Sequence, residues 1–321
     1  MRFAYTAEQE SFAASLESLL ASAETVAVAR AWAVDDTAPG LKLWQRLADQ
    51  GVTALLVPEE SGGLGAGGVE LAIAFEALGR HAVPGPWVES AAYLPRALEG
   101  EALAALAEGA VGTVAAPPHT PYALDADAAD QVYAVAAGAL VLATPVGRAA
   151  SIDVTRRLFE VTPTGATTGD GAATLDRAFD TAVLACSAQL LGAGERLLAD
   201  TVAYVKQRRQ FGREIGSYQA VKHTLADVRI ALDFARPLVL GAALSLDTVD
   251  SGRDVSAAKV AAGDAAYLAS RGALQLHGAI GYTRELDLSL WITKVRALVS
   301  AWGTPAYHRR RVLDSLVGRG A

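Results

Sequence analysis

The sequence predicts a mainly α-helical protein with a small β domain in the middle of the chain. Apolar residues recur at helical spacing over the first 110 residues and again from about residue 173 onward. Between 111 and 172, short apolar runs separated by turn residues replace that spacing. We therefore expect an N-terminal helical domain (1–110), a truncated β middle domain (111–172) and a C-terminal four-helix bundle (173–321).

In the N-terminal region the helices are separated by glycine and proline. Thr6 and Gln9 have the spacing of a capping box, which predicts the start of a first helix. A second helix is predicted to end at Gly51, and the helical period resumes from 69 to 78. The glycine-rich loop 59–68 lacks the Lys-Ser/Thr pair and the βαβ context of a nucleotide loop, so we interpret it as a turn.

The middle and C-terminal regions differ in the length of their apolar segments. The strand candidates are short runs at 112–116, 131–144 (in two pieces) and 158–162. The helical candidates are long segments near 175–208, 217–247, 254–276 and 285–315. Short polar connections between the long segments are typical of an antiparallel bundle.

Composition restricts the partners and the environment of the chain. Of its 321 residues, 52% are hydrophobic and 20% are charged, which is typical of a folded globular protein. The net charge of −7 argues against general binding to nucleic acid or anionic membranes, because both need a basic face. The N-terminus lacks the apolar core of a secretory signal, and no run reaches the roughly 18 uninterrupted apolar residues of a membrane span. We therefore expect a cytoplasmic protein with no membrane segment.

Metal and thiol chemistry find little support in the sequence. The single cysteine, Cys186, excludes an intrachain disulfide, and its apolar neighbours favour a buried filler over a reactive thiol. His223 and Asp227 are spaced to share a helix face, but two ligands without a third make a poor metal site. His277 has no such neighbour. We predict no metal site.

A dense polar turn from Arg208 to Gln219 interrupts the long helical segments. Its arginines have the planar, charged donors that pair with diphosphate oxygens. The structural alternative is a solvated basic end of a helix, which the helix dipole favours.

The order of helices, small β domain and four-helix bundle resembles the acyl-CoA dehydrogenase family along nearly the whole chain. The local matches are Val57 to Gly65, Phe75 to Arg80, Arg208 to Ala226 and Gln275 to Tyr282. The resemblance implies FAD as cofactor, with the polar turn reaching it across a subunit boundary. The residues that the resemblance assigns to FAD binding are Arg208, Gln210, Phe211, Gln219, Gln275, Gly278 and Thr304.

The chain departs from this family at the catalytic base. Family members remove the substrate α proton with a carboxylate that usually lies in a Tyr-Glu-Gly-Thr stretch, and here that stretch is 301–304, with Trp302 in the place of glutamate. A Trp side chain cannot accept a proton. In some members the base lies on an earlier helix, and that position falls at Ala182. We therefore predict no catalytic residue; the nearest carboxylates, Asp180, Glu285 and Asp287, are interpreted as caps or surface charges.

This combination resembles the short, non-basic subunit of actinobacterial α2β2 steroid and acyl-CoA dehydrogenases. It implies a subunit of a FAD-dependent acyl-CoA dehydrogenase that contributes to FAD binding and acts with a second acyl-CoA dehydrogenase-like subunit. An acyl-CoA, with a steroid side-chain CoA among the choices, is the implied substrate, and electron-transfer flavoprotein is the implied acceptor. Two alternatives stay open: a homo-oligomeric flavoprotein with a relocated base, and a flavin-free structural subunit.

Overall fold

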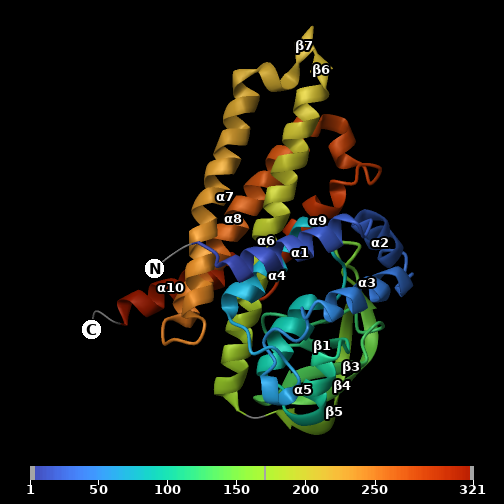
Figure 1. Ribbon diagram of the computed structural model, residues 1–321, viewed down its shortest axis with the longest axis vertical. Helices are drawn as coiled ribbons and strands as arrows, with labels where there is room; N and C mark the ends of the chain where they lie inside the picture. Colours follow the sequence, from blue (N-terminus) through green and yellow to red (C-terminus); the bar gives the residue numbers. More distant parts are fainter. Residues whose placement is uncertain (1–3, 170, 319–321) are drawn as a thin grey trace.

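Helix α6 (Ala172–Gln207) runs through most of the long axis of the molecule, and the other elements pack around it (Figure 1). The computed structural model describes residues 4–169 and 171–318. The upper half in this view is a helical bundle, and the lower half holds the N-terminal helices and the β sheet. Of the described helices, the part of α6 from Thr174 to Gln207 is long and apolar enough to cross a membrane, but 83% of its most apolar stretch is buried inside the protein.

The N-terminal region is helical, as predicted. Its helices are α1 (Ala7–Ala21), α2 (Thr25–Trp32), α3 (Ala38–Asp49), α4 (Gly68–Arg80) and α5 (Gly100–Ala107). The capping box is confirmed, because Thr6 Oγ1 accepts a bond from the Gln9 backbone N–H (3.2 Å) while the Gln9 side chain accepts one from Thr6 N–H (2.9 Å).

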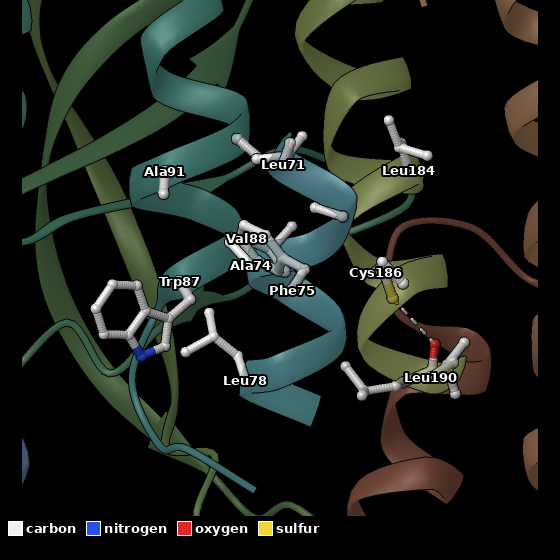
Figure 2. Packing of buried hydrophobic residues seen from close by; sticks show 14 of the residues in the cluster. Leu71, Ala74, Phe75, Leu78, Trp87, Val88, Ala91, Leu184, Cys186 and Leu190 are labelled. Atoms are coloured by element: carbon white, nitrogen blue, oxygen red, sulfur yellow. Dashed lines mark hydrogen bonds between the residues drawn. The ribbon is translucent and has the colours of Figure 1, made fainter. Parts of the chain in front are cut away.

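Helices α4 and α6 meet at backbone contact distance. A Cβ on Gly79 would lie 2.0 Å from the Gln189 carbonyl oxygen, and one on Gly192 would lie 1.9 Å from that of Glu76. Glycine on both helices is therefore required for this approach. Figure 2 shows the result, with Leu71, Phe75 and Leu78 of α4 packed between Trp87 and the α6 side chains. Cys186 is a buried free thiol in this core, in line with the predicted filler role.

The middle region forms a five-stranded sheet with the order β1-β3-β4-β5-β2. Its strands are β1 (Gly112–Ala115), β2 (Ala123–Leu124), β3 (Gln131–Ala136), β4 (Ala139–Ala149) and β5 (Leu158–Gly169). Strand β1 is parallel to β3, and the other pairs are antiparallel. The three strand regions predicted from apolar runs are confirmed, and the structure adds the short β2 and extends β4 and β5.

The C-terminal region differs from prediction in its last member. Helices α6, α7 (Gln219–Ser245) and α8 (Ser251–His277) match the first three predicted segments. The fourth segment, 285–315, is not one continuous helix: α9 (Ser289–Ser300) and α10 (Pro305–Val317) replace it. Trp302 and Gly303 have positive φ values of 56° and 103°, and Pro305 cannot donate to a preceding turn, so the helix must stop between them.

Buried ion pairs attach the sheet region to the helices. Lys294 of α9 donates to Asp153 Oδ2 (3.1 Å) and to Thr155 Oγ1 (3.0 Å) in the loop between β4 and β5. Arg157, at the end of the same loop, makes a bidentate pair with Asp127 and lies 4.6 Å from the ring centroid of Trp32. These contacts place the β4–β5 loop against α9 and α2.

Candidate functional site

The polar turn predicted to contact FAD is a β-hairpin at the tip of the bundle (Figure 1). Strands β6 (Arg209–Gln210) and β7 (Arg213–Glu214) pair around a two-residue turn at Phe211 and Gly212. Both turn residues have positive φ, 51° and 81°, as a two-residue hairpin with the right-handed strand twist requires. Positive φ is strained for phenylalanine, and the Phe211 side chain is also 91% exposed.

The arginines of the hairpin carry charge that the chain neutralises only weakly. Arg208 makes no ion pair within residues 4–169 and 171–318, and Arg209 is 3.9 Å from Glu214 across the hairpin. The Arg213 guanidinium lies 3.9 Å from the ring centroid of Tyr218. The hairpin is therefore a cationic arm on an acidic protein, and it presents guanidinium groups and an aromatic ring to solvent.

The structure brings six of the seven predicted cofactor residues to one end of the bundle. Helix α6 ends and α7 begins at the hairpin, and the stacking of Tyr204 on His277 (4.1 Å between ring centroids) holds the end of α8 beside the last turns of α6. The six residues at this end are Arg208, Gln210, Phe211, Gln219, Gln275 and Gly278. Thr304 lies elsewhere, after α9, where its hydroxyl caps α10 by accepting from Tyr307 N–H (3.3 Å).

Trp302 fills the place where the resemblance puts a glutamate. Its side chain is 1% exposed, and its ring centroid is 5.2 Å from Tyr93 and 6.3 Å from Phe179. His308 Nε2 is 2.9 Å from the Trp302 carbonyl oxygen, and burial lowers the pKa of His308 to about 3. The neutral imidazole donates that bond. The Trp302 side chain itself is an aromatic plug with no proton acceptor.

Two of the three carboxylates considered as a relocated base, Asp180 and Asp287, are engaged in contacts with other side chains. Asp180 accepts bonds from Arg311 and from Ser251 Oγ. Asp287 pairs with Arg30 at 2.6 Å, and Glu285 is an exposed residue of the loop before α9. The alternative base position, Ala182, is fully buried in α6. No group of three metal-binding side chains occurs in the described parts of the chain, and His223 and Asp227 are both exposed.

A pocket of about 290 Å³ lies beside Trp302, because its lining includes Ala301, the preceding residue of the chain. It is bounded by the loop after β1, the β4–β5 loop and the end of α9, including Ala301. Glu89 is a buried carboxylate that lines it, at the start of a π-helical turn (Glu89–Tyr93). Burial raises the pKa of Glu89 to about 7, against the attraction of Arg156, which also lines the pocket.

Glu89 and Arg156 are not among the site residues predicted from the sequence. The available signal for Glu89 was a lone carboxylate inside the apolar run from Trp87 to Leu94, where a charge is costly unless it has a partner. A buried acid with a shifted pKa in a pocket is a recognised mark of a functional site. No sequence pattern marks Arg156, because only the fold brings the β4–β5 loop against α9.

The family of the chain follows from comparison with known proteins. The model of the acyl-CoA dehydrogenase N-terminal domain matches residues 6–101, and that of the acyl-CoA dehydrogenase C-terminal domain matches residues 169–317. The acyl-CoA dehydrogenase IpdE2 of Mycobacterium tuberculosis is 33% identical over 322 residues, which cover 95% of this chain and 96% of the relative. The chain belongs to the acyl-CoA dehydrogenase family.

Solved acyl-CoA dehydrogenase structures share the fold over the full chain. The Tcur3481-Tcur3483 steroid ACAD variant superposes with a TM-score of 0.86 at 22% identity, covering 98% of this chain and 99% of that one. The ChsE4-ChsE5 complex from Mycobacterium tuberculosis gives a TM-score of 0.80 at 22% identity, with 99% of both chains covered. Membership of the acyl-CoA dehydrogenase family supports an oxidoreductase function and implies a flavin. The two main features of the candidate site are the buried Trp302 side chain and the exposed arginine hairpin.

Proposed function

We propose that this chain is the subunit without a base in a two-subunit, FAD-dependent acyl-CoA dehydrogenase of the cytoplasm. The observation that carries the proposal is the pairing of two opposite features in one chain. The position of the base holds buried Trp302, while the hairpin with Arg208, Gln210 and Phe211 projects into solvent at the far end of the bundle. A ligand of that hairpin is therefore held together with another polypeptide.

The residues present fit the diphosphate part of FAD better than its ring system. Guanidinium groups without strong ion pairs, the start of α7 and the Gly278 turn gather at one end, where backbone N–H groups and charge suit an anion. The pocket beside Trp302 has only about 290 Å³ for a ring system and a substrate together. When bound, FAD accepts the hydride of the dehydrogenation. We place the ring system and the proton-accepting carboxylate in the partner subunit, and we assign to this chain the binding of the diphosphate.

The relatives support the choice of partner and substrate class. The solved ChsE4-ChsE5 structure is a complex, and the Tcur3481-Tcur3483 structure is that of a steroid ACAD. We therefore propose a second acyl-CoA dehydrogenase-like subunit as the partner, a steroid side-chain CoA thioester as substrate, and electron-transfer flavoprotein as acceptor. A homo-oligomer with a relocated base is the weaker alternative, because Asp180 and Asp287 are engaged in ion pairs.

The test compares the isolated chain with the chain co-expressed with its partner. We expect the isolated chain to hold little FAD and to show no dehydrogenase turnover, and the complex to hold FAD and to turn over. In the complex, Arg208→Gln should weaken FAD binding about tenfold or more, because a charge-assisted hydrogen bond contributes about 1.5–3 kcal/mol. The matched control is Arg46→Gln, at an exposed arginine of α3.

FAD content from absorbance and turnover with an artificial acceptor provide the readout. Full FAD occupancy and turnover by the isolated chain would reject the proposal. A colourless complex with no FAD in either subunit would favour the flavin-free structural subunit instead.

A further inference from the structure

The loop 283–288, between the Gly278–Tyr282 turn and α9, is bound by an arginine from the N-terminal part of the chain. Arg30 of α2 donates from Nη2 to the Arg284 carbonyl oxygen (3.1 Å) and to Asp287 Oδ1 (2.6 Å). Its Nε donates to the same carboxylate oxygen (3.2 Å). Among the described residues, no other group from outside the segment 278–300 hydrogen-bonds to this loop. One planar guanidinium group therefore holds a main-chain atom and a side chain of the loop together.

Arg30 comes from a helix that buried contacts fix in place. Trp32, the last residue of α2, is 1% exposed, and its indole N–H donates to Asp125 Oδ1 (3.1 Å). The Arg157 side chain donates to the Trp32 carbonyl oxygen (3.2 Å) and lies over the indole ring. Gly40 of α3 lies against the same ring, because a Cβ there would come within 2.3 Å of Trp32 Cε3. Helix α2 is thus a rigid support for the Arg30 side chain.

The exposure of the Arg30 contacts decides what they contribute. The Arg30 and Asp287 side chains are 42% and 60% exposed, and exposed ion pairs add little to the stability of a fold. A hydrogen bond to a main-chain carbonyl oxygen, in contrast, fixes the position of the backbone itself. We therefore expect Arg30 to set the place of the 283–288 loop rather than to keep the protein folded.

The loop continues from the Gly278–Tyr282 turn, which belongs to the proposed cofactor-binding end of the bundle. Ile280 and Tyr282 are 43% and 76% exposed, so these side chains do not anchor the turn in the core. One end of the turn follows α8, whose last residue, His277, is buried. The other end continues into the 283–288 loop, so the place of that loop decides where the turn points.

We propose that Arg30 is a positioning residue for FAD: by holding the 283–288 loop, it keeps the Gly278–Tyr282 turn in the arrangement that binds the dinucleotide. The inference rests on the proposed function, because it adds a residue of α2 to the support of the same FAD site. If the binding arrangement is populated only part of the time, the apparent affinity falls by that fraction. Loss of Arg30 therefore weakens FAD binding without removing a direct contact to FAD.

The first experiment measures the loop in the isolated full-length chain, without flavin. Hydrogen–deuterium exchange reports on the backbone N–H groups of Thr283 and Ser289, which bond within the turn and the loop. We expect Arg30→Met to speed exchange at 283–290 about threefold to tenfold, because the hydrogen bonds that hold the loop are lost, and to leave exchange in strand β3 unchanged. Arg309→Met removes an exposed pair with Asp264 and should leave exchange at 283–290 unchanged.

The second experiment measures the affinity for FAD in the complex with the partner subunit, from flavin absorbance. Arg30→Met should weaken binding about threefold to tenfold. Arg30→Lys should restore part of this loss, because an ammonium group still donates to one of the two acceptors. Asp287→Asn should weaken binding least, since its amide oxygen and the Arg284 carbonyl oxygen both still accept from Arg30. Loss of an ion pair alone would instead make Asp287→Asn and Arg30→Met equal.

Three results would overturn the proposal. The first is unchanged exchange at 283–290 in Arg30→Met. The second is faster exchange together with unchanged affinity for FAD, which would show that the place of the loop does not matter to the cofactor. The third is that Asp287→Asn or Arg309→Met weakens FAD binding as much as Arg30→Met does.

The two experiments also separate this inference from the proposed function. A complex without FAD in either subunit would reject the proposed function, and the positioning role of Arg30 with it. The exchange at 283–290 needs no flavin, so it tests the hold of Arg30 on the loop in either case.

Discussion

Trp302 is an apolar side chain where a carboxylate is expected, and Glu89 is a carboxylate where an apolar side chain is expected. Trp302 stands where the resemblance to the family implies a glutamate, and Glu89 is a carboxylate in an otherwise apolar run. The structure buries both, Trp302 among aromatic rings and Glu89 against the pocket. The Trp302 side chain therefore offers no proton acceptor, while the buried Glu89 carboxyl lines a pocket that also includes Ala301, the neighbour of Trp302.

The buried Glu89 carboxyl makes stability depend on pH. Its pKa is about 7 in the folded protein, raised by burial, against an ordinary value of 4.5. The folded state therefore binds more protons between these values, and the free energy of unfolding falls as pH rises from about 4.5 to 7. The contribution of Glu89 is on the order of 3 kcal/mol over this range.

Replacing Glu89 by Gln removes this titration. We expect the difference in the free energy of unfolding between Glu89→Gln and the unmodified chain to grow in favour of the variant as pH rises from 4.5 to 7. Urea unfolding at a series of pH values measures it. A constant difference across that range would show that Glu89 does not titrate with a raised pKa.

At the residue scale, a motif of fixed length permits a prediction from the sequence alone. Trp302 is found by its position within the four-residue stretch 301–304, and the loss of the base that it implies stays a prediction. Glu89 was not, because burial without a partner depends on the surrounding loops and helices, which lie up to about 200 residues away in the chain. Thr304 shows the same limit: its place beside α10 is a consequence of the helix break at Trp302 and Gly303.

At the scale of elements, the break between α9 and α10 is held by one glycine. Gly303 has a φ of 103°, and a Cβ there would lie 2.5 Å from His308 Nε2. We expect Gly303→Ala to lower the free energy of unfolding by more than about 1 kcal/mol, because both backbone strain and a clash oppose it. Urea unfolding measures the effect.

Comparing Gly138→Ala with Gly303→Ala separates the energetic cost of backbone strain from that of the steric clash. Gly138 has a φ of 80° in the β3–β4 turn, and a Cβ there would meet nothing within 4 Å. It should therefore cost less than Gly303→Ala. Equal losses for the two variants would show that His308 moves aside without cost.

Periodicity predicted the helices well and their interruptions poorly. The segment 285–315 was expected as one helix because apolar residues continue at helical spacing on both sides of the break. Gly303 and Pro305 were the available signals, since glycine ends helices and proline begins them. The Phe211-Gly212 turn was harder, because phenylalanine is not a residue that favours positive φ.

On the scale of the whole molecule, two sites of opposite character lie apart. The hairpin is exposed and cationic, whereas the pocket beside Trp302 opens to the surface at Ile152 and is lined mainly by apolar residues. The order of helices, sheet and bundle followed from the sequence because each region has its own hydrophobic period. The relative placement of the regions did not, because it depends on pairs such as Lys294 and Asp153, which are 141 residues apart.

The Lys294–Asp153 pair joins the sheet region to α9, and its removal is predicted to be costly. Lys294 is 3% exposed and Asp153 is not exposed at all, so Lys294→Met leaves a buried carboxylate without its counter-charge. We expect a loss of about 3–5 kcal/mol in the free energy of unfolding, measured with urea.

Lys294→Met combined with Asp153→Asn should lose less than the sum of the single changes, because the two groups interact directly. Arg309→Met, which removes an exposed pair with Asp264, is the control and should cost at most about 1 kcal/mol. A loss no larger than the control's would show that other contacts hold the sheet in place.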